Sequence, residues 1–178
     1  MNQFKITMKN KINLITTALL SILMIFTANT FAQEEKASPP RTATGGAGGS
    51  EITIKYSSPA VNGRQIWGDL VPLGEIWRAG ANEATTFETS KDIKVQGKEL
   101  PAGKYSFFII PNEGESTVIF NKDTGLWGTN NYDSSKDVLR VNIPSNQSPT
   151  LEERLVYEVN YDGVEMRWEY GRAFIKID

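Results

Sequence analysis

Residue types suited to ligand recognition are concentrated in one stretch, IWGDLVPLGEIWRAGANEA, at residues 66–84. Trp67 and Trp77 lie ten residues apart, and Arg78 follows the second tryptophan directly. An aromatic ring offers contact area, while an arginine, an amide or a carboxylate fixes the orientation of a ligand. The stretch therefore predicts a binding cleft, although it matches no catalytic motif of known mechanism.

A second aromatic-rich stretch, GLWGTNNY, occupies residues 125–132 and mixes two aromatic rings with amides and a hydroxyl. Loops at one end of a β scaffold are common places for function. We therefore expect both stretches to gather at one rim and to form a ligand-binding site. The residues expected to line it are Trp67, Asp69, Trp77, Arg78, Asn82, Glu83, Trp127, Asn130 and Tyr132.

Each of these residues also has a purely structural interpretation. Tryptophans of small β domains commonly fill the core, where each buries roughly 200 Å². Arg78 could clamp a carboxylate or phosphate, or it could form a buried ion pair with Glu83 or Asp69. The sequence leaves both interpretations open.

The residue types that are missing restrict the chemistry more firmly. The chain contains no histidine and no cysteine. This excludes imidazole bases, thiolate nucleophiles, thiolate zinc sites and disulfides. Acid–base chemistry would depend on Asp, Glu, Lys or Tyr, and a metal would have to be a hard ion held by oxygen atoms. No cofactor is predicted.

The carboxylates that could support hydrolysis lie in predicted loops. Glycoside hydrolysis needs two carboxyl groups, about 5 Å apart for retention or about 6.5–9.5 Å apart for inversion. The candidates are Asp69, Glu75, Glu83 and Asp133. Acidic loop residues are usually solvated or turn-forming, so no catalytic residue is predicted.

Calcium binding is only weakly indicated. Segments 123–125 and 133–137 offer oxygen atoms but lack the Asp-x-Asp-x-Asp-Gly spacing, and Lys136 lies among the would-be ligands. No metal site is predicted.

The N-terminal 32 residues have the three parts of a secretory signal peptide: a positive start, an apolar stretch and the small-x-small exit Thr30-Phe31-Ala32. A retained anchor is the alternative, but the apolar run is shorter than the roughly 20 residues that span a bilayer. Since no cysteine follows it, a lipoprotein is excluded. We expect export to a periplasm or beyond.

Residues 33–50, QEEKASPPRTATGGAGGS, contain no bulky apolar side chain, and this predicts a flexible Pro/Gly-rich leader. Residues 51–178 then form one domain by size. That domain has 14 basic and 19 acidic residues, a formal charge of −5, and no basic run. Nucleic acid and anionic membrane surfaces are therefore not expected partners.

Alternating apolar residues and frequent turn residues predict β structure throughout the domain. Asp162-Gly163 between the alternating runs 155–161 and 164–170 is the strongest hairpin signal. The other expected strands are 51–56, 84–90, 93–95, 104–110, 117–120, 138–143 and 173–177. We predict a single antiparallel β-sandwich, jelly-roll or immunoglobulin-like, with at most one or two short helical turns, at 150–154 and within 68–77.

Four blocks in this order resemble the secreted bacterial family called domain of unknown function 2911. They are SSPAVNGRQIWGDLVPLGEIWRAGANEATTFE, LPAGKYSFFIIP, TVIFNKDTGLWGTNNYD and DVLRVNIP, and the resemblance covers about residues 57–178. It implies an exported all-β domain. It implies no substrate, cofactor or catalytic residue.

The sequence favours a non-catalytic exported module that binds a small molecule, a glycan or an envelope partner. The first alternative is a carboxylate-dependent hydrolase or isomerase that acts on carbohydrate. The second is a structural envelope protein whose tryptophans all lie in the core. An exposed indole beside Arg78 would favour binding, whereas a close carboxylate pair would favour catalysis.

Overall fold

The computed structural model describes residues 37–178. The predicted signal peptide and the first part of the predicted leader lie outside this range. Across the described part of the chain, no helix has the length and apolar character needed to cross a bilayer.

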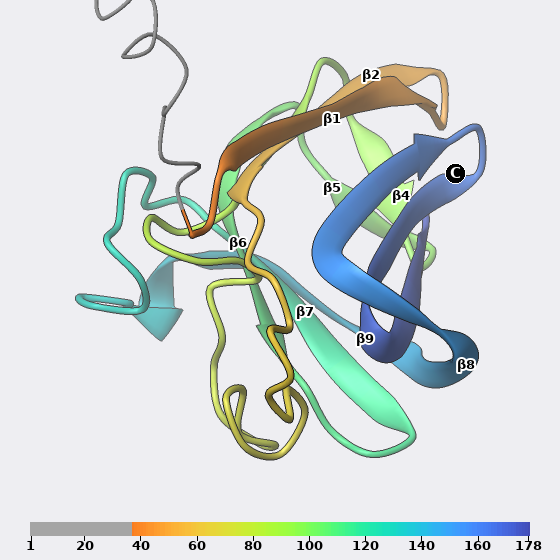
Figure 1. Ribbon diagram of the computed structural model, residues 1–178. Helices are drawn as coiled ribbons and strands as arrows, with labels where there is room; N and C mark the ends of the chain where they lie inside the picture. The colour runs from red at the N-terminus through yellow and green to blue at the C-terminus, as the bar shows by residue number, and fades with distance from the viewer. Residues whose placement is uncertain (1–36) are drawn as a thin grey trace, which may run out of the picture. The chain divides into compact units, whose positions relative to one another are not determined.

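The described chain is built almost entirely from β-strands (Figure 1). They are β1 (Pro40–Ala47), β2 (Ser50–Ser57), β3 (Thr86–Thr89), β4 (Ile93–Val95), β5 (Lys98–Leu100), β6 (Gly103–Ile110), β7 (Glu115–Asn121), β8 (Asp137–Asn160) and β9 (Gly163–Lys176). A single 3-10 turn, η1 (Ser134–Lys136), precedes β8. The predicted all-β class is confirmed.

Seven of the strands form one antiparallel sheet in the order β1-β2-β3-β6-β7-β8-β9. This order follows the sequence, with the small β4–β5 hairpin inserted between β3 and β6. Jelly rolls and immunoglobulin domains require Greek-key connections between strands that are not neighbours in sequence. The sheet is therefore a meander in place of the expected sandwich topologies.

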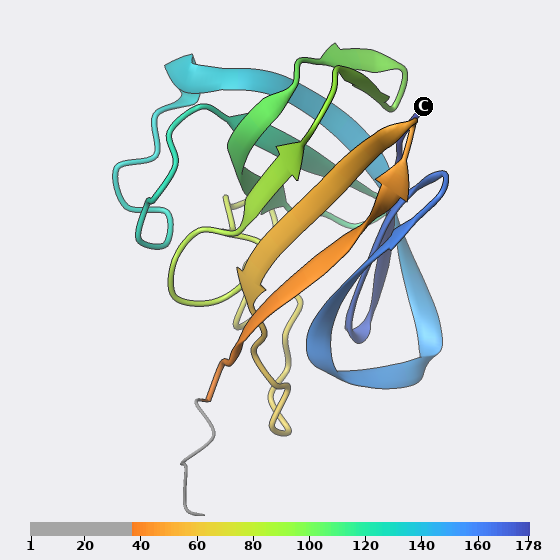
Figure 2. The same cartoon turned by 90° about the horizontal axis from the view of Figure 1, so that it is seen from above.

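The sheet curls until its two ends approach each other, so that it is nearly closed. β1 and β2 run as a long hairpin beside the β8–β9 hairpin (Figure 2). Beyond β2 the chain pairs with β8, since Val61 N donates to Glu153 O at 2.7 Å and Leu155 N donates to Pro59 O at 3.0 Å.

The inner face of the curled sheet holds the core. Ile52, Ile54 and Tyr56 of β2 alternate into it, as the sequence predicts. Phe107 and Phe120 pack edge-on with ring centroids 5.4 Å apart. These rings belong to a large cluster of buried side chains, whose burial stabilises the curled sheet.

The prediction of a flexible leader is wrong for Pro40–Ala47, which forms β1. This segment forms a strand although it contains few apolar side chains. Its backbone pairs with β2 along its whole length, from Pro40↔Ser57 to Ala47↔Ser50, and this ladder orders it. Its glycines allow close approach: a Cβ on Gly45 would lie 2.9 Å from the carbonyl oxygen of Val159 in β8. The domain therefore begins before the predicted residue 51.

The prediction of separate strands with a helical turn at 150–154 is also wrong, because β8 continues from Asp137 to Asn160. Pro144 is tolerated because it lies where β8 changes partner from β7 to β9, with pairs Glu115↔Pro144 and Ser145↔Ala173. No helical turn occurs at 68–77 either.

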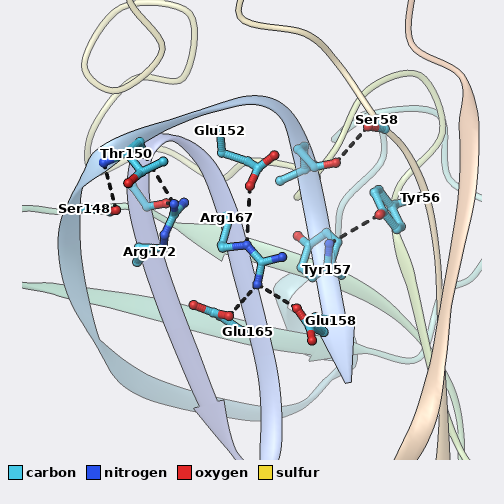
Figure 3. A network of polar contacts seen from close by, with 12 residues as sticks. Tyr56, Ser58, Ser148, Thr150, Glu152, Tyr157, Glu158, Glu165, Arg167 and Arg172 are labelled. Carbon is cyan, nitrogen blue, oxygen red and sulfur yellow. Dashed lines mark hydrogen bonds and ion pairs between the residues drawn. The ribbon is translucent and has the colours of Figure 1, made fainter. Parts of the chain in front are cut away.

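The register between β8 and β9 shifts between Gln147 and Glu152 and again before Val156, so β8 bows away from its partner. Side chains join the two strands across this bow (Figure 3). Arg167 of β9 pairs with Glu158 at 2.8 Å, with Glu152 at 3.5 Å and with Glu165. Further along, Arg172 Nη2 donates to Thr150 O at 3.3 Å.

Candidate functional site

The two aromatic-rich loops meet, as the sequence predicts. Ala84 N donates to Leu126 O at 2.9 Å, and Gly128 N donates to Asn82 O at 3.1 Å. Between these bonds, Glu83 and Trp127 form an isolated antiparallel bridge. This short ladder fixes the segment around Arg78 against the loop that carries Trp127.

A small pocket of about 200 Å³ opens beside this ladder. We call it the Arg78 pocket. Its lining consists of Arg78, Asn82, Trp127, Gly128, Thr129 and Asn130. The indole of Trp127 is 60% exposed, the most open of the four tryptophans. Four of the nine predicted site residues therefore lie together, drawn from two loops that are far apart in sequence.

The guanidinium of Arg78 has no ion-pair or hydrogen-bond partner within residues 37–178, and its Nε atom is buried. The alternative ion pairs with Glu83 and Asp69 are therefore not formed. Gly128 lets the guanidinium approach the loop, because a Cβ there would lie 3.4 Å from Arg78 Nη1. The side chain as a whole is half-buried, and a buried donor atom such as Nε that lacks a partner is costly, which marks a place where a water molecule or a ligand can bind.

The backbone around Arg78 is held in conformations that L-residues rarely adopt. Ala79 has φ +53°, Asn82 has φ +58° and Asn131 has φ +61°. The Ala79 carbonyl accepts hydrogen bonds from Thr85 Oγ1 at 2.9 Å and from Tyr157 Oη at 2.8 Å. Backbone strain of this kind persists only where the surroundings enforce it, and it gathers at functional sites.

Trp77 and Trp67 do not reach the Arg78 pocket. Trp77 is buried and stacks on Trp168, with ring centroids 5.7 Å apart, and its Nε1 donates to Gly80 O at 3.1 Å. Trp67 packs edge-on against both rings and is only partly buried. The structural interpretation therefore applies to Trp77, which belongs to the core.

Tyr132 and Asp69 are also placed outside the pocket. The Tyr132 ring packs against Phe108, and its hydroxyl donates to Asp137 at 2.7 Å and accepts from Arg140 at 2.6 Å. Burial, followed by the hydrogen bond to Asp137, raises the pKa of Tyr132 to about 12. Asp69 is exposed and lines neither pocket.

The four candidate carboxylates do not line either pocket. Asp133 instead caps η1 by accepting a hydrogen bond from Ser135 N at 2.9 Å, and the hydrogen bonds from Ser135 lower the pKa of Asp133. Asp123 pairs with Lys136 at 2.7 Å. Within residues 37–178, no three acidic side chains gather closely enough to hold a metal ion.

A larger cleft of about 790 Å³ lies elsewhere, and of the predicted residues only Trp67 lines it. We call it the large cleft. It is bounded by the β6–β7 turn and by the middle parts of β8 and β9. No sequence signal marks this cleft, because its walls include the bow of β8, and the bow lies in the polar segment 144–154 between the two predicted strands.

Comparison with known proteins defines the relationship of the chain to others. A family described as protein of unknown function (DUF2911) has a sequence model that matches residues 38–177. The chain belongs to the DUF2911 family. No match was found among curated proteins or among solved structures. The matched range begins before residue 57, where the sequence resemblance starts, and includes β1.

In this DUF2911 protein the groups that line the Arg78 pocket are suited to binding a ligand. It provides a delocalised cation, the amide of Asn130, the hydroxyl of Thr129 and one face of an open indole. The pocket contains no carboxylate that could act as a base or a nucleophile. The arrangement suits the binding of an anionic group that adjoins a flat or apolar surface.

Proposed function

We propose that this DUF2911 protein is an exported, non-catalytic binding module whose Arg78 pocket receives the anionic group of a small ligand. The observation that supports this most directly is the half-buried side chain of Arg78, whose Nε atom is buried and whose guanidinium has no partner among the described residues and stands beside an open indole. Support for export comes from the residue pattern of the first 32 positions.

The dimensions of the pocket limit the class of ligand. Sites for whole drug-sized molecules usually have volumes of about 300–1,000 Å³. At about 200 Å³ the Arg78 pocket is smaller, so it suits a carboxylate or phosphate group, with the rest of the ligand lying against Trp127. A guanidinium binds either group with two parallel hydrogen bonds.

The experiment measures binding of small carboxylates and phosphates, some with and some without an aromatic ring, by titration calorimetry. Arg78→Ala is expected to weaken binding about 10- to 100-fold, because one charge-assisted contact contributes about 1.5–3 kcal/mol. Arg78→Lys keeps the charge but loses the planar guanidinium, so its affinity is expected to lie between those of Arg78→Ala and the parent protein.

The matched control is Arg41→Ala, which removes an exposed arginine of β1 that does not line the pocket. Its affinity should equal that of the parent protein. The melting temperature of Arg78→Ala should not fall, since Arg78 has no hydrogen-bond or ion-pair partner to lose within residues 37–178. Failure of every anion to bind, or equal binding by Arg78→Ala, would contradict the proposal.

A further inference from the structure

The large cleft is a second concave site, distinct from the Arg78 pocket, and the two share no lining residue. Its volume of about 790 Å³ lies within the range of sites that hold an extended small molecule. Trp67 contributes to its lining, together with the β6–β7 turn and the bowed middle of β8.

The Trp67 ring is held rigidly at the wall of this cleft. Its Nε1 donates to Trp168 O at 3.3 Å, and its ring packs edge-on against Trp77 and Trp168. The ring also rests on the backbone at Gly171, where a Cβ would lie 2.6 Å from Trp67 Nε1. Because the ring cannot move far, a ligand that stacks on it loses little affinity to side-chain ordering.

The backbone beside Trp67 is strained in the same way as the backbone beside Arg78. Glu169, which lines the cleft, has φ +52°, although it is not a glycine. Its carboxylate accepts a hydrogen bond from Ile66 N at 3.3 Å, which ties β9 to the start of the Trp67 segment. This contact keeps the wall in place when no ligand is bound.

The polar groups of the cleft are of the kind that recognise hydroxyl groups. The side-chain amides of Asn112, Asn146 and Gln147 line it and have no hydrogen-bond partner within the described chain. An amide donates and accepts, and so does a sugar hydroxyl, so each can form paired hydrogen bonds with such a ligand. An indole face complements the apolar face of a sugar ring.

The charges of the cleft argue against an anionic ligand. Glu113 and Glu169 contribute two negative charges, while Arg172 contributes one positive charge. The guanidinium of Arg172 is already bonded to Thr150 O and to Gly171 O, each at 3.3 Å. A polyanion would therefore meet net repulsion, and a neutral ligand would not.

We infer that the large cleft binds a short neutral oligosaccharide, with one sugar ring stacked on Trp67 and its hydroxyl groups bonded to the amides of Asn146 and Gln147. This site is independent of the anion site in the Arg78 pocket. The inference therefore does not depend on the proposed function.

The test is calorimetric titration with chitotriose, cellotriose, maltotriose and a sulfated counterpart. At least one neutral trisaccharide is expected to bind. Asn146→Ala and Gln147→Ala should each weaken binding about threefold to tenfold, because each removes one neutral hydrogen bond. Both side chains are exposed, so neither substitution is expected to change the melting temperature.

Trp67→Ala should abolish binding, but it also disturbs the tryptophan cluster. The inference is therefore tested by Asn146→Ala and Gln147→Ala. Arg78→Ala serves as the control and should bind the trisaccharide with unchanged affinity. The inference is overturned if no neutral trisaccharide binds, if only the sulfated sugar binds, or if both amide variants bind as well as the parent. Loss of binding in Arg78→Ala would also overturn it, because it would place the sugar in the other site.

Discussion

At the scale of single residues, the position of Arg78 depends on the residue that follows it. Ala79 is fully buried in a left-handed conformation, and its carbonyl oxygen accepts two side-chain hydrogen bonds. One of these comes from Tyr157 of β8, which is distant in sequence. The core therefore holds the strained backbone that points Arg78 into its pocket.

Tyr157→Phe is expected to lower the free energy of unfolding by about 1–2 kcal/mol, because it removes a hydrogen bond to a buried carbonyl oxygen. Chemical denaturation at pH 7 measures this change. The control is Tyr161→Phe, since Tyr161 is 85% exposed and its hydroxyl has no partner in the described chain. If both variants unfold at the same denaturant concentration as the parent, the Tyr157 bond does not hold Ala79.

Sequence reasoning could predict part of the candidate site. Arg78, Asn82, Trp127 and Asn130 lie together in the structure, and the sequence indicates this proximity because they belong to two short loops, each dense in polar and aromatic residues. The separation of Trp77 from that group could not be predicted. It depends on stacking against Trp168, which a sequence pattern only marks as an apolar position of a strand.

At the scale of elements, the two ends of the sheet show what the sequence could and could not predict. The β8–β9 hairpin was predicted because Asp162-Gly163 interrupts two alternating runs, although the structure places the turn at 161–162 and starts β9 at Gly163. β1 was missed because a strand that obtains its order from neighbouring backbone needs few apolar side chains. Its order depends on backbone pairing with β2, which the residue pattern of the segment alone does not indicate.

Gly45→Ala is expected to destabilise the protein by about 1–3 kcal/mol, because the added Cβ would lie 2.9 Å from backbone and side-chain atoms of Val159. The adjacent Gly46→Ala is the matched control, since its Cβ would meet only Ser50 O at 3.9 Å. Urea unfolding of both variants measures the difference. Equal midpoints would show that β1 does not pack against β8.

At the scale of the whole described chain, one continuous meander explains why local signals sufficed for the fold class. Each strand of the main sheet pairs with a sequence neighbour, apart from the inserted β4–β5 hairpin, so turn residues and alternation carry most of the information. The curling of the sheet is different. It brings β1 against β8, which are far apart in sequence, so no local pattern announces it.

The stability of this core is expected to depend on alkaline pH. Burial raises the pKa of Tyr157 well above its ordinary 10.0, and burial with the Asp137 hydrogen bond raises that of Tyr132 to about 12. Unfolded tyrosines lose their protons near pH 10 while these two keep theirs. The contribution of both is therefore complete below pH 10 and decreases as the pH rises above 10, and that of Tyr132 is lost as the pH passes about 12.

Denaturant midpoints measured between pH 8 and pH 11 check this dependence. The free energy of unfolding should fall above pH 10, and Tyr157→Phe should show a shallower fall than the parent. An equal decline of the free energy of unfolding in both proteins would show that Tyr157 does not contribute to the loss of stability above pH 10.

The unequal burial of the four indoles gives the molecule two optical reporters. Trp127 stands open to solvent, whereas Trp67, Trp77 and Trp168 lie with ring centroids 5.7–6.0 Å apart and share excitation energy. A water-soluble quencher such as acrylamide should therefore remove the emission of Trp127 first and leave a bluer remainder from the cluster. Binding in the Arg78 pocket should therefore change the longer-wavelength emission of Trp127. Binding in the large cleft should change the shorter-wavelength emission of the cluster that contains Trp67.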